Sequence, residues 1–235
     1  MQLRKEVNNF FRTMLIVFRD FKPDEILLSF NGGKDATVVL HLLSLFASKY
    51  YQQLRGGVKS ARRNNSISTV PGLNTLNSLI SHVLFLVQPD EFGSIIDFVD
   101  KMEKLYNVSI SRIHVGTKDS FRHILSSYIS VNGIRCTIEG SRFSDPNARG
   151  LKVFTSSSGT WPPFLRVSPI LQWNYRLVWK FLIEFNLPYC TLYDEGYTSL
   201  GNKTNTKKNP FLKINNKFRP AYELENGEHE RAGRF

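Results

Sequence analysis

The chain has 235 residues, of which 41% are apolar and 13% aromatic, so it can bury one substantial core and is not a disordered tail. Its 31 lysines and arginines exceed its 20 acidic residues and give a net charge of +11, which favours anionic partners without choosing among nucleic acid, acidic membrane and phosphorylated small molecules. The 2 cysteines, Cys136 and Cys190, lie far apart, which excludes a disulfide framework, argues against structural zinc and favours a reducing compartment.

The first predicted element is an amphipathic helix over residues 2–20, within an N-terminal segment that we place at 1–21. Apolar residues recur there at helical spacing: Val7, Phe10, Phe11, Met14, Phe18 and Phe21. The longest apolar run, residues 14–18, ends at Arg19 and Asp20 and is too short for a signal peptide or a membrane span. We therefore expect a soluble, cytoplasmic protein.

A phosphate-binding loop is predicted where the apolar run at 25–28 meets Ser29-Phe30-Asn31-Gly32-Gly33-Lys34-Asp35. Adjacent glycines let the backbone turn sharply with its N–H groups against an anion, and the helix that follows directs the positive end of its dipole to the same place. Lys34 adds a mobile positive charge, and Asp35 could hold a metal or a water beside the phosphates. The spacing matches neither a Walker loop nor a dinucleotide-binding loop, and an ordinary strand-to-helix turn stays an alternative.

Strands and helices alternate through the following part of the chain. After an exposed insertion at 52–77, strands are predicted over 82–87, 108–115 and 134–139. Between them we predict a helix with the apolar stripe Ile95, Ile96, Val99, Met102 and Leu105, and another over 119–130; a later core helix contains Trp173, Leu177, Trp179, Phe181 and Phe185. The alternation predicts an α/β fold with a mostly parallel twisted sheet and helices on both faces. Ligands of such sheets bind beyond the carboxyl ends of the strands, where the glycine loop, residues 88–92 and the segment after Glu139 would meet.

Further motifs follow the fourth strand in a defined order. They are Gly140-Ser141-Arg142-Phe143-Ser144-Asp145-Pro146, Trp161-Pro162-Pro163-Phe164, the stretch from Pro188-Tyr189-Cys190 to Ser199-Leu200-Gly201, and the terminal Glu230-Arg231-Ala232-Gly233-Arg234. Together with the glycine loop, this set resembles the eukaryotic FAD synthases, FMN adenylyltransferases of the PAPS-reductase-like PP-loop family. The resemblance covers roughly residues 25–235 apart from the insertion. It implies one domain with the PP-loop ATP pyrophosphatase fold (adenine nucleotide alpha hydrolase-like) and a C-terminal region, 150–235, that binds flavin and closes over the active site.

The resemblance also implies a reaction and the residues that perform it. AMP passes from ATP to FMN by in-line attack of the FMN phosphate on the α-phosphate, with FAD and pyrophosphate as products and Mg²⁺ as cofactor. The implied catalytic residues are Asn31, Asp35, Asp145, Arg231 and Arg234, with Asp35 and Asp145 as metal candidates, and the ATP contacts are the seven loop residues 29–35 with Gly140 and Arg142. The candidates for a flat apolar flavin surface are Trp161, Pro162, Phe164, Arg166, Tyr189, Tyr193 and Tyr197. The expected partners are FMN and ATP alone, without membrane or nucleic acid, and the expected state is a monomer.

Two departures from the family concern substrate handling. Relatives usually carry a Thr-Asp pair ahead of Trp-Pro, where this chain has Ser157 and Ser158, so an acidic group that could contact flavin is missing. Residues 88–92 also lack the Phe-Pro-Glu of relatives. These departures leave the chemistry intact and put the handling of FMN in question.

Three other classes of protein fit the sequence less well. A sulfonucleotide reductase needs a nucleophilic cysteine in a C-terminal motif, and no cysteine follows Cys190. A PP-loop enzyme that adenylates a base of tRNA would use the positive charge, but it should carry an added nucleic-acid domain. A non-catalytic nucleotide- or flavin-binding module has no need for an intact Asn31, Asp35 and Asp145.

Overall fold

The computed structural model describes residues 2–55, 76–116, 118–146, 148 and 150–235. Its centre is a six-stranded sheet in the order β3-β2-β1-β4-β6-β5. The strands are β1 (Ile26–Ser29), β2 (His82–Val87), β3 (Ile110–His114), β4 (Cys136–Ile138), β5 (Phe154–Ser156) and β6 (Leu165–Val167). Neighbouring strands are parallel except for the antiparallel β5–β6 pair, which confirms the predicted mostly parallel sheet.

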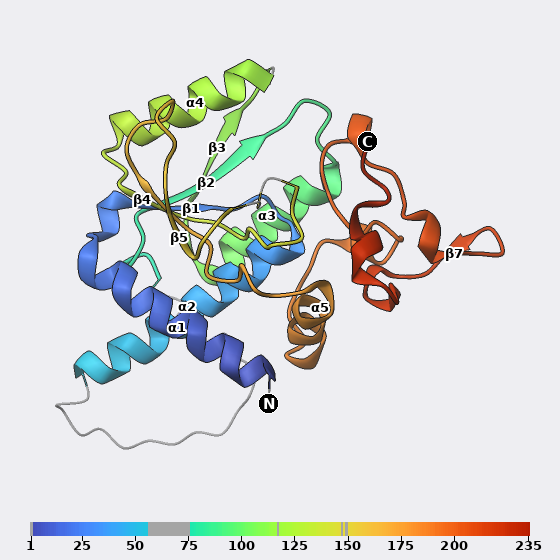
Figure 1. Cartoon of the computed structure of the whole chain (residues 1–235), viewed down its shortest axis with the longest axis horizontal. Coiled ribbons are helices and arrows are strands. Elements are labelled where there is room, and N and C mark those ends of the chain that lie inside the picture. The colour runs from blue at the N-terminus through green and yellow to red at the C-terminus, as the bar shows by residue number, and fades with distance from the viewer. Residues whose placement is uncertain (1, 56–75, 117, 147, 149) are drawn as a thin grey trace.

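Helices cover both faces of the sheet, because successive residues of a strand point to opposite sides. Ile26 and Leu28 join the larger core, together with α1 (Gln2–Asp20), α2 (Lys34–Arg55), α3 (Gly93–Tyr106) and α5 (Tyr175–Glu184). Leu27 lies between them in sequence and packs on the other face, near Ile129 of α4 (Lys118–Val131). Figure 1 shows α4 on one side of the sheet and α1 and α2 on the other. The helices predicted for both faces are thus confirmed.

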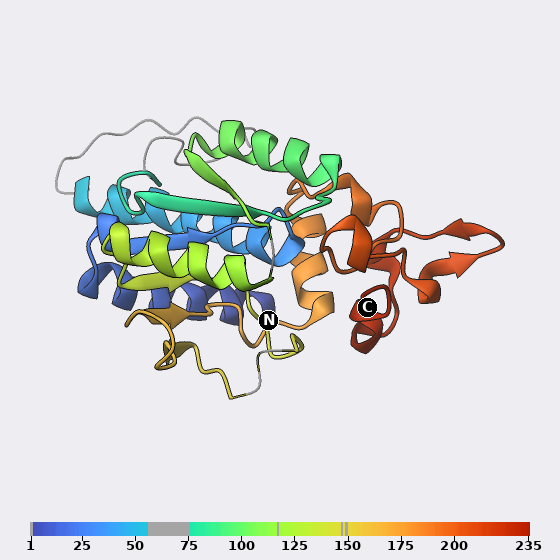
Figure 2. The same ribbon diagram turned by 90° about the horizontal axis from the view of Figure 1, so that it is seen from above.

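The C-terminal region after α5 consists of 3-10 turns and one short hairpin. Its elements are η2 (Thr191–Tyr193), η3 (Lys203–Asn205), η4 (Pro210–Leu212), β7 (Lys213–Ile214), β8 (Lys217–Phe218), η5 (Ala221–Glu223) and η6 (Gly227–Arg231). Figure 2 shows this region beyond one end of the sheet, with α5 beside it and the β7–β8 hairpin at its outer tip. The Lys203 N–H donates to the Asp90 carbonyl at 2.9 Å, so the region touches the loop that leaves β2.

Several predicted details are wrong. Phe185 is 53% exposed because α5 ends one residue earlier, so it is a surface residue and not a core one. Ile96 is 37% exposed, whereas Phe98 is buried, so Phe98 and not Ile96 belongs to the buried face of α3. The predicted insertion begins inside α2, which continues to Arg55; Leu76 is buried in the core, and residues 56–75 of the insertion lie outside the described residues.

Strands β5 and β6 were not predicted. Each has 3 residues, and the two pair with each other, Phe154 opposite Val167 and Ser156 opposite Leu165. A run of 3 residues shows too little alternation to mark a strand.

Among the described residues, no helix combines the length and the apolar character that crossing a bilayer requires.

Candidate active site

The glycine loop leaves the carboxyl end of β1 and enters α2. Gly32 has a φ of +70°, a conformation that side chains rarely adopt, and a Cβ there would lie 3.0 Å from the Ile95 Cγ2 of α3. The Gly33 N–H donates to the Asn31 Oδ1 at 3.0 Å, so the exposed Asn31 closes the loop on itself. Because α2 begins at Lys34, the positive end of its dipole faces the loop. The loop thus has the geometry of an anion-binding turn.

The segment after β4 lies directly against the start of α2. A Cβ on Gly140 would lie 2.9 Å from the backbone nitrogen of Ala36, so a side chain at this position would separate the two segments. Two residues later, the Arg142 Nε lies 2.8 Å from the Asp35 Oδ1, and the Arg142 backbone N–H donates to the Asp145 Oδ2 at 2.8 Å. The two predicted metal-binding carboxylates therefore contact the same arginine.

Four charged side chains form a buried cluster at the start of α2, which we call the charge cluster: Lys34, Asp35, Arg142 and Glu230. The side chains of Lys34, Arg142 and Glu230 are 2%, 0% and 7% exposed. The Lys34 Nζ contacts Asp35 at 2.9 Å and also contacts Glu230, and the Arg142 Nη2 lies 2.5 and 2.6 Å from the two Glu230 oxygens. Two cations face two carboxylates, so the cluster is neutral, as burial requires.

The pKa shifts in the charge cluster follow from this pairing. Burial disfavours the charged form of Lys34, but the carboxylates of Asp35 and Glu230 outweigh it and raise its pKa. Burial likewise disfavours the Glu230 carboxylate, and Lys34 and Arg142 outweigh it and lower the pKa of Glu230. Lys34 and Glu230 therefore stay charged at neutral pH.

Arg231 and Arg234 lie in the same C-terminal segment as Glu230. The Arg231 Nη1 donates to the Ser199 Oγ at 3.4 Å, and the Arg234 Nη1 donates to the Leu200 carbonyl at 2.6 Å. Burial and the charge of Arg231 lower the pKa of Arg234. No carboxylate of the described residues pairs with either guanidinium, so the two arginines form a cationic site that the described part of the protein does not neutralise.

The predicted flavin residues fall into two groups. The first group lies in β6 or just before it: Trp161, Pro162, Phe164 and Arg166. Because β6 runs parallel to β4 and β1, the residues before β6 lie at the amino ends of the strands. Phe164 packs with the α4-side core, and the Arg166 Nη2 pairs with the Glu139 Oε2 at 2.7 Å. Tyr189, Tyr193 and Tyr197 belong to the C-terminal region. No ring contact or hydrogen bond among the described residues joins the two groups.

Tyr193 is part of the scaffold in this structure. It is 1% exposed, its ring centroid lies 5.2 Å from that of Trp179, and its hydroxyl accepts the Lys34 backbone N–H at 2.9 Å. Burial raises the pKa of Tyr193 well above its usual value, so the hydroxyl stays protonated. Tyr189 and Tyr197 are partly exposed, as a stacking surface requires. The sequence does not distinguish the buried tyrosine from the two partly exposed ones, because their burial depends on tertiary packing.

Two acidic residues of the site were missed. Glu230 lies 196 residues from Lys34 in sequence, and Glu139 was noted only as the end of a strand. The terminal Glu-Arg-x-Gly-Arg motif was the one available signal for Glu230, but acidic residues near a chain end are usually solvated.

The carboxylates present suit a magnesium ion that is shared with a nucleotide. No three His, Cys, Asp or Glu side chains of the described residues gather as a metal-binding group. Mg²⁺ is usually held by one or two carboxylates with substrate phosphates and water. Asp35 and Asp145 supply two carboxylates beside Arg142, and the Asp35 Oδ1 meets the Arg142 Nε at 2.8 Å in an ion pair without the alignment of a hydrogen bond. The donor set therefore fits an ion held jointly by protein and phosphates.

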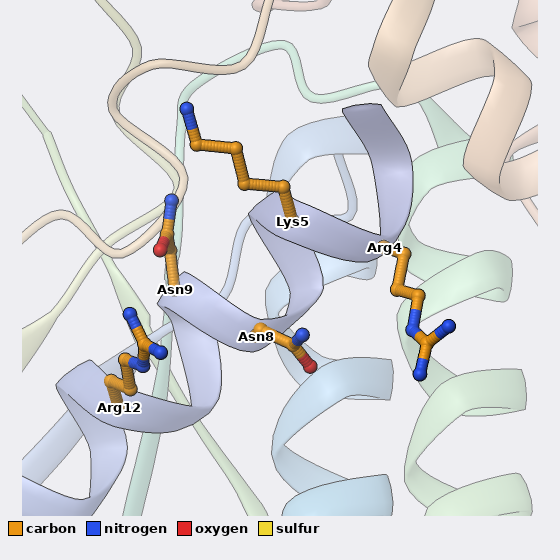
Figure 3. A pocket seen from close by; sticks show the side chains of 5 residues that line it. All are labelled: Arg4, Lys5, Asn8, Asn9 and Arg12. Carbon is orange, nitrogen blue, oxygen red and sulfur yellow. The ribbon is translucent and has the colours of Figure 1, made fainter. Parts of the chain in front are cut away.

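A shallow cavity of about 300 Å³ lies along α1, and Figure 3 shows the side chains that line it. They are Arg4, Lys5, Asn8, Asn9 and Arg12. All belong to one helix, and none belongs to the glycine loop or the charge cluster. The cavity is separate from the candidate active site.

Known proteins are similar to this chain over most of its length. The model of the phosphoadenosine phosphosulfate reductase domain family matches residues 25–208. A probable FAD synthase of Schizosaccharomyces pombe is 34% identical over 220 residues, which cover 92% of this chain and 74% of the relative. A probable FAD synthase of Caenorhabditis elegans is 33% identical over 93% of this chain, but the chain spans only 38% of the nematode protein.

A solved structure shares the fold. The FMN adenylyltransferase of Candida glabrata in complex with FAD and inorganic pyrophosphate matches with a TM-score of 0.83 at 23% identity, over 100% of this chain and 88% of that chain. The family model covers most of this chain, and the fission yeast relative is both close in sequence and largely covered. The chain therefore belongs to the phosphoadenosine phosphosulfate reductase domain family and, within it, to the FAD synthases.

Proposed function

We propose that the chain is an FMN adenylyltransferase, which transfers AMP from ATP to FMN and yields FAD and pyrophosphate. The observation that carries the proposal is that the C-terminal segment with Arg231 and Arg234 is joined to the glycine loop through the Lys34–Glu230 ion pair. Membership of the FAD synthases supports it, because the fission yeast relative is named a probable FAD synthase. The Candida glabrata structure contains FAD and pyrophosphate, the two products of this reaction.

The reaction brings two phosphorylated anions together, so the site must first offset their repulsion. The glycine loop and the start of α2 would hold the β- and γ-phosphates, with the Asn31 amide as a donor, and Arg231 and Arg234 would neutralise charge around them. An oxygen of the FMN phosphate then forms a bond to the α-phosphorus, and the bond from that phosphorus to the bridging oxygen of pyrophosphate breaks. Positioning and charge neutralisation supply the catalysis, and no side chain forms a covalent intermediate.

Magnesium is part of the proposal. Asp35 and Asp145 would hold Mg²⁺ directly or through water, together with the phosphates of ATP. When bound, the ion supplies charge neutralisation to the leaving pyrophosphate.

For the flavin we propose the partly exposed Tyr189 and Tyr197 of the C-terminal region, with Tyr193 as support behind them. Ser158 is exposed, and it stands where relatives have an acidic group. Because Ser158 lies beside Trp161 before β6, away from the glycine loop, we expect this difference to leave the transfer step intact. The monomeric state and the cytoplasmic location stay predictions.

The test of the reaction is direct. Purified protein with ATP, Mg²⁺ and FMN should form FAD and pyrophosphate in equal amounts, measured by chromatography of the flavins and a coupled pyrophosphate assay. Absence of FAD, together with transfer of AMP to tRNA, would replace the proposal by the tRNA-modifying alternative.

Asp35→Asn should lower kcat for FAD formation about 100-fold or more, because it removes a carboxylate that would hold Mg²⁺ at the phosphates. The matched control is Asp24→Asn, at an exposed position of the turn that precedes β1. Circular dichroism should show a folded Asp35→Asn protein, and the loss of turnover should exceed any loss of folded fraction. Wild-type turnover in this variant would remove Asp35 from the mechanism.

A further inference from the structure

Lys34 and Arg142 were predicted to contact ATP, but both are neutralised within the protein. Lys34 is paired with Asp35 and Glu230, and Arg142 with the same two carboxylates. Both cations are almost completely buried. Neither is therefore free to hold a phosphate in this arrangement, and the role of counterion falls to Arg231 and Arg234.

Glu230 lies on a segment that buried hydrogen bonds hold in place. The Thr198 hydroxyl donates to the Glu230 carbonyl at 2.6 Å. The Asn209 Nδ2 donates to the Thr198 hydroxyl at 2.7 Å and to the His229 carbonyl at 2.8 Å. Arg231 is the next residue, so the position of the Glu230 carboxylate and that of the terminal arginines are set together.

Through its two cations, Glu230 acts on both oxygens of Asp35. The Lys34 Nζ lies 2.9 Å from the Asp35 Oδ2, and the Arg142 Nε lies 2.8 Å from the Asp35 Oδ1. We propose that Glu230 is a positioning residue of the transfer reaction: its carboxylate holds Lys34 and Arg142 against Asp35, while the hydrogen bonds of Thr198 and Asn209 keep the segment with Arg231 and Arg234 in place. This inference rests on the proposed function.

Removal of the Glu230 charge would leave two buried cations with one carboxylate. An unpaired buried charge is strongly unfavourable, so Lys34 or Arg142 would turn toward any phosphate that enters the loop. The pyrophosphate-bound protein would gain from such a contact, but Asp35 would lose the partners that orient it. Loss of the Glu230 charge should therefore lower turnover without lowering the affinity for pyrophosphate.

The experiment compares Glu230→Gln, Glu230→Asp and the control Glu228→Gln, which changes an exposed glutamate of the same turn. In Glu230→Gln, kcat should fall about 10-fold or more while the Kd of inorganic pyrophosphate, measured by calorimetry, stays equal or decreases. Glu230→Asp keeps the charge and should recover part of kcat, and Glu228→Gln should stay within about two-fold of the wild type. A parallel loss of kcat and pyrophosphate affinity, or an unchanged kcat in Glu230→Gln, would overturn the inference.

A charge-balanced variant keeps the test valid if Glu230→Gln folds poorly. Lys34→Met with Glu230→Gln leaves Arg142 opposite Asp35, a neutral pair. If Glu230 acts through Lys34, the added Glu230→Gln change should lower kcat much less than it does in the wild type. Equal, additive losses of kcat would contradict this.

A wild-type protein that makes no FAD would reject the proposed function. The pyrophosphate affinities then decide about Glu230 alone. Tighter or equal binding in Glu230→Gln would support the linkage, and weaker binding would reject it.

Discussion

Charged residues that lie inside this protein are matched with opposite charges at close range. Arg142 is among the largest fully buried side chains, and its two carboxylate partners come from α2 and from the C-terminal segment. Burial disfavours the charge of Arg142, but Asp35 and Glu230 outweigh it and raise its pKa. Loss of one partner costs more than the pair contributes, because it leaves the other charge unpaired in a low dielectric. Single substitutions in this cluster therefore have effects that reach beyond the residue changed.

His41 is a buried titratable residue outside the site. Burial lowers its pKa to about 4, and its Nδ1 lies 2.8 Å from the Tyr106 hydroxyl. The native state therefore binds fewer protons than the unfolded chain, whose histidine has a pKa near 6.5. The contribution of neutral His41 to stability should be fully present above about pH 6.5. The free energy of unfolding should then fall by about 3 kcal/mol in total as the pH drops toward 4.

Urea unfolding at pH 7.5 and at pH 4.5 measures this effect. His41→Gln lacks the titrating ring, so the unfolding free energy should depend less on pH in this variant than in the wild type. His123→Gln, at an exposed position of α4, is the matched control. Equal pH dependence in the wild type and His41→Gln would contradict the assignment.

Residue patterns predicted the local parts of the site and missed the distant ones. The glycine loop was predictable because its turn chemistry lies within seven consecutive residues. Glu230 was not, because its contact with Lys34 joins residues 196 positions apart. The burial of Tyr193 depends on Trp179 in the same way. Contacts of this kind follow from tertiary packing, which local spacing does not record.

The helices and strands with a clear pattern of apolar residues were predictable from the sequence. β1 and β2 are apolar runs bounded by turn residues, and α1 carries an apolar stripe, so each was found close to its observed bounds. β5 and β6 are held by pairing with their neighbours, and 3 residues carry no period of their own. The end of α5 was placed one residue too far, because Phe185 continues the apolar spacing beyond the last helical residue.

Helix α1 offers a test of how much its buried stripe contributes. Met14 is fully buried in the core, whereas its neighbour Leu15 is 50% exposed. Met14→Ala should lower the free energy of unfolding by about 2–5 kcal/mol, because it removes buried methylenes and leaves a cavity. Leu15→Ala, the matched control, should change it by less than about 0.5 kcal/mol. Similar losses in both variants, measured by urea unfolding, would show that α1 packs with a different face.

On the scale of the whole molecule, the C-terminal region lies against the glycine loop, to which the Lys34–Glu230 ion pair joins it. The sheet and its helices form most of the cores, and the region after α5, which adds Leu192, Leu212 and Leu224 to the larger core, lies beyond one end of the sheet (Figure 2). Few regular elements hold it together, so its position depends on specific contacts: the charge cluster, the Asn209 hydrogen bonds and the bridge between Thr206 and Arg234. We expect changes in this region to alter ligand binding as well as global stability.

Gly233 tests that expectation, because the terminal segment lies against residues 206–207 with no space for a side chain. The Lys207 N–H donates to the Gly233 carbonyl at 2.8 Å, and a Cβ on Gly233 would lie 2.2 Å from the Lys207 oxygen. Gly233→Ala must therefore move the segment and carry Arg234 with it. The Kd of pyrophosphate should rise about 10-fold, since a displaced guanidinium no longer meets the phosphate, while the free energy of unfolding should fall by about 1–3 kcal/mol. Gly159→Ala, where a Cβ meets nothing within 4 Å, is the matched control and should leave both values unchanged. Unaltered pyrophosphate binding in Gly233→Ala would show that the terminal arginines act from a position independent of this contact.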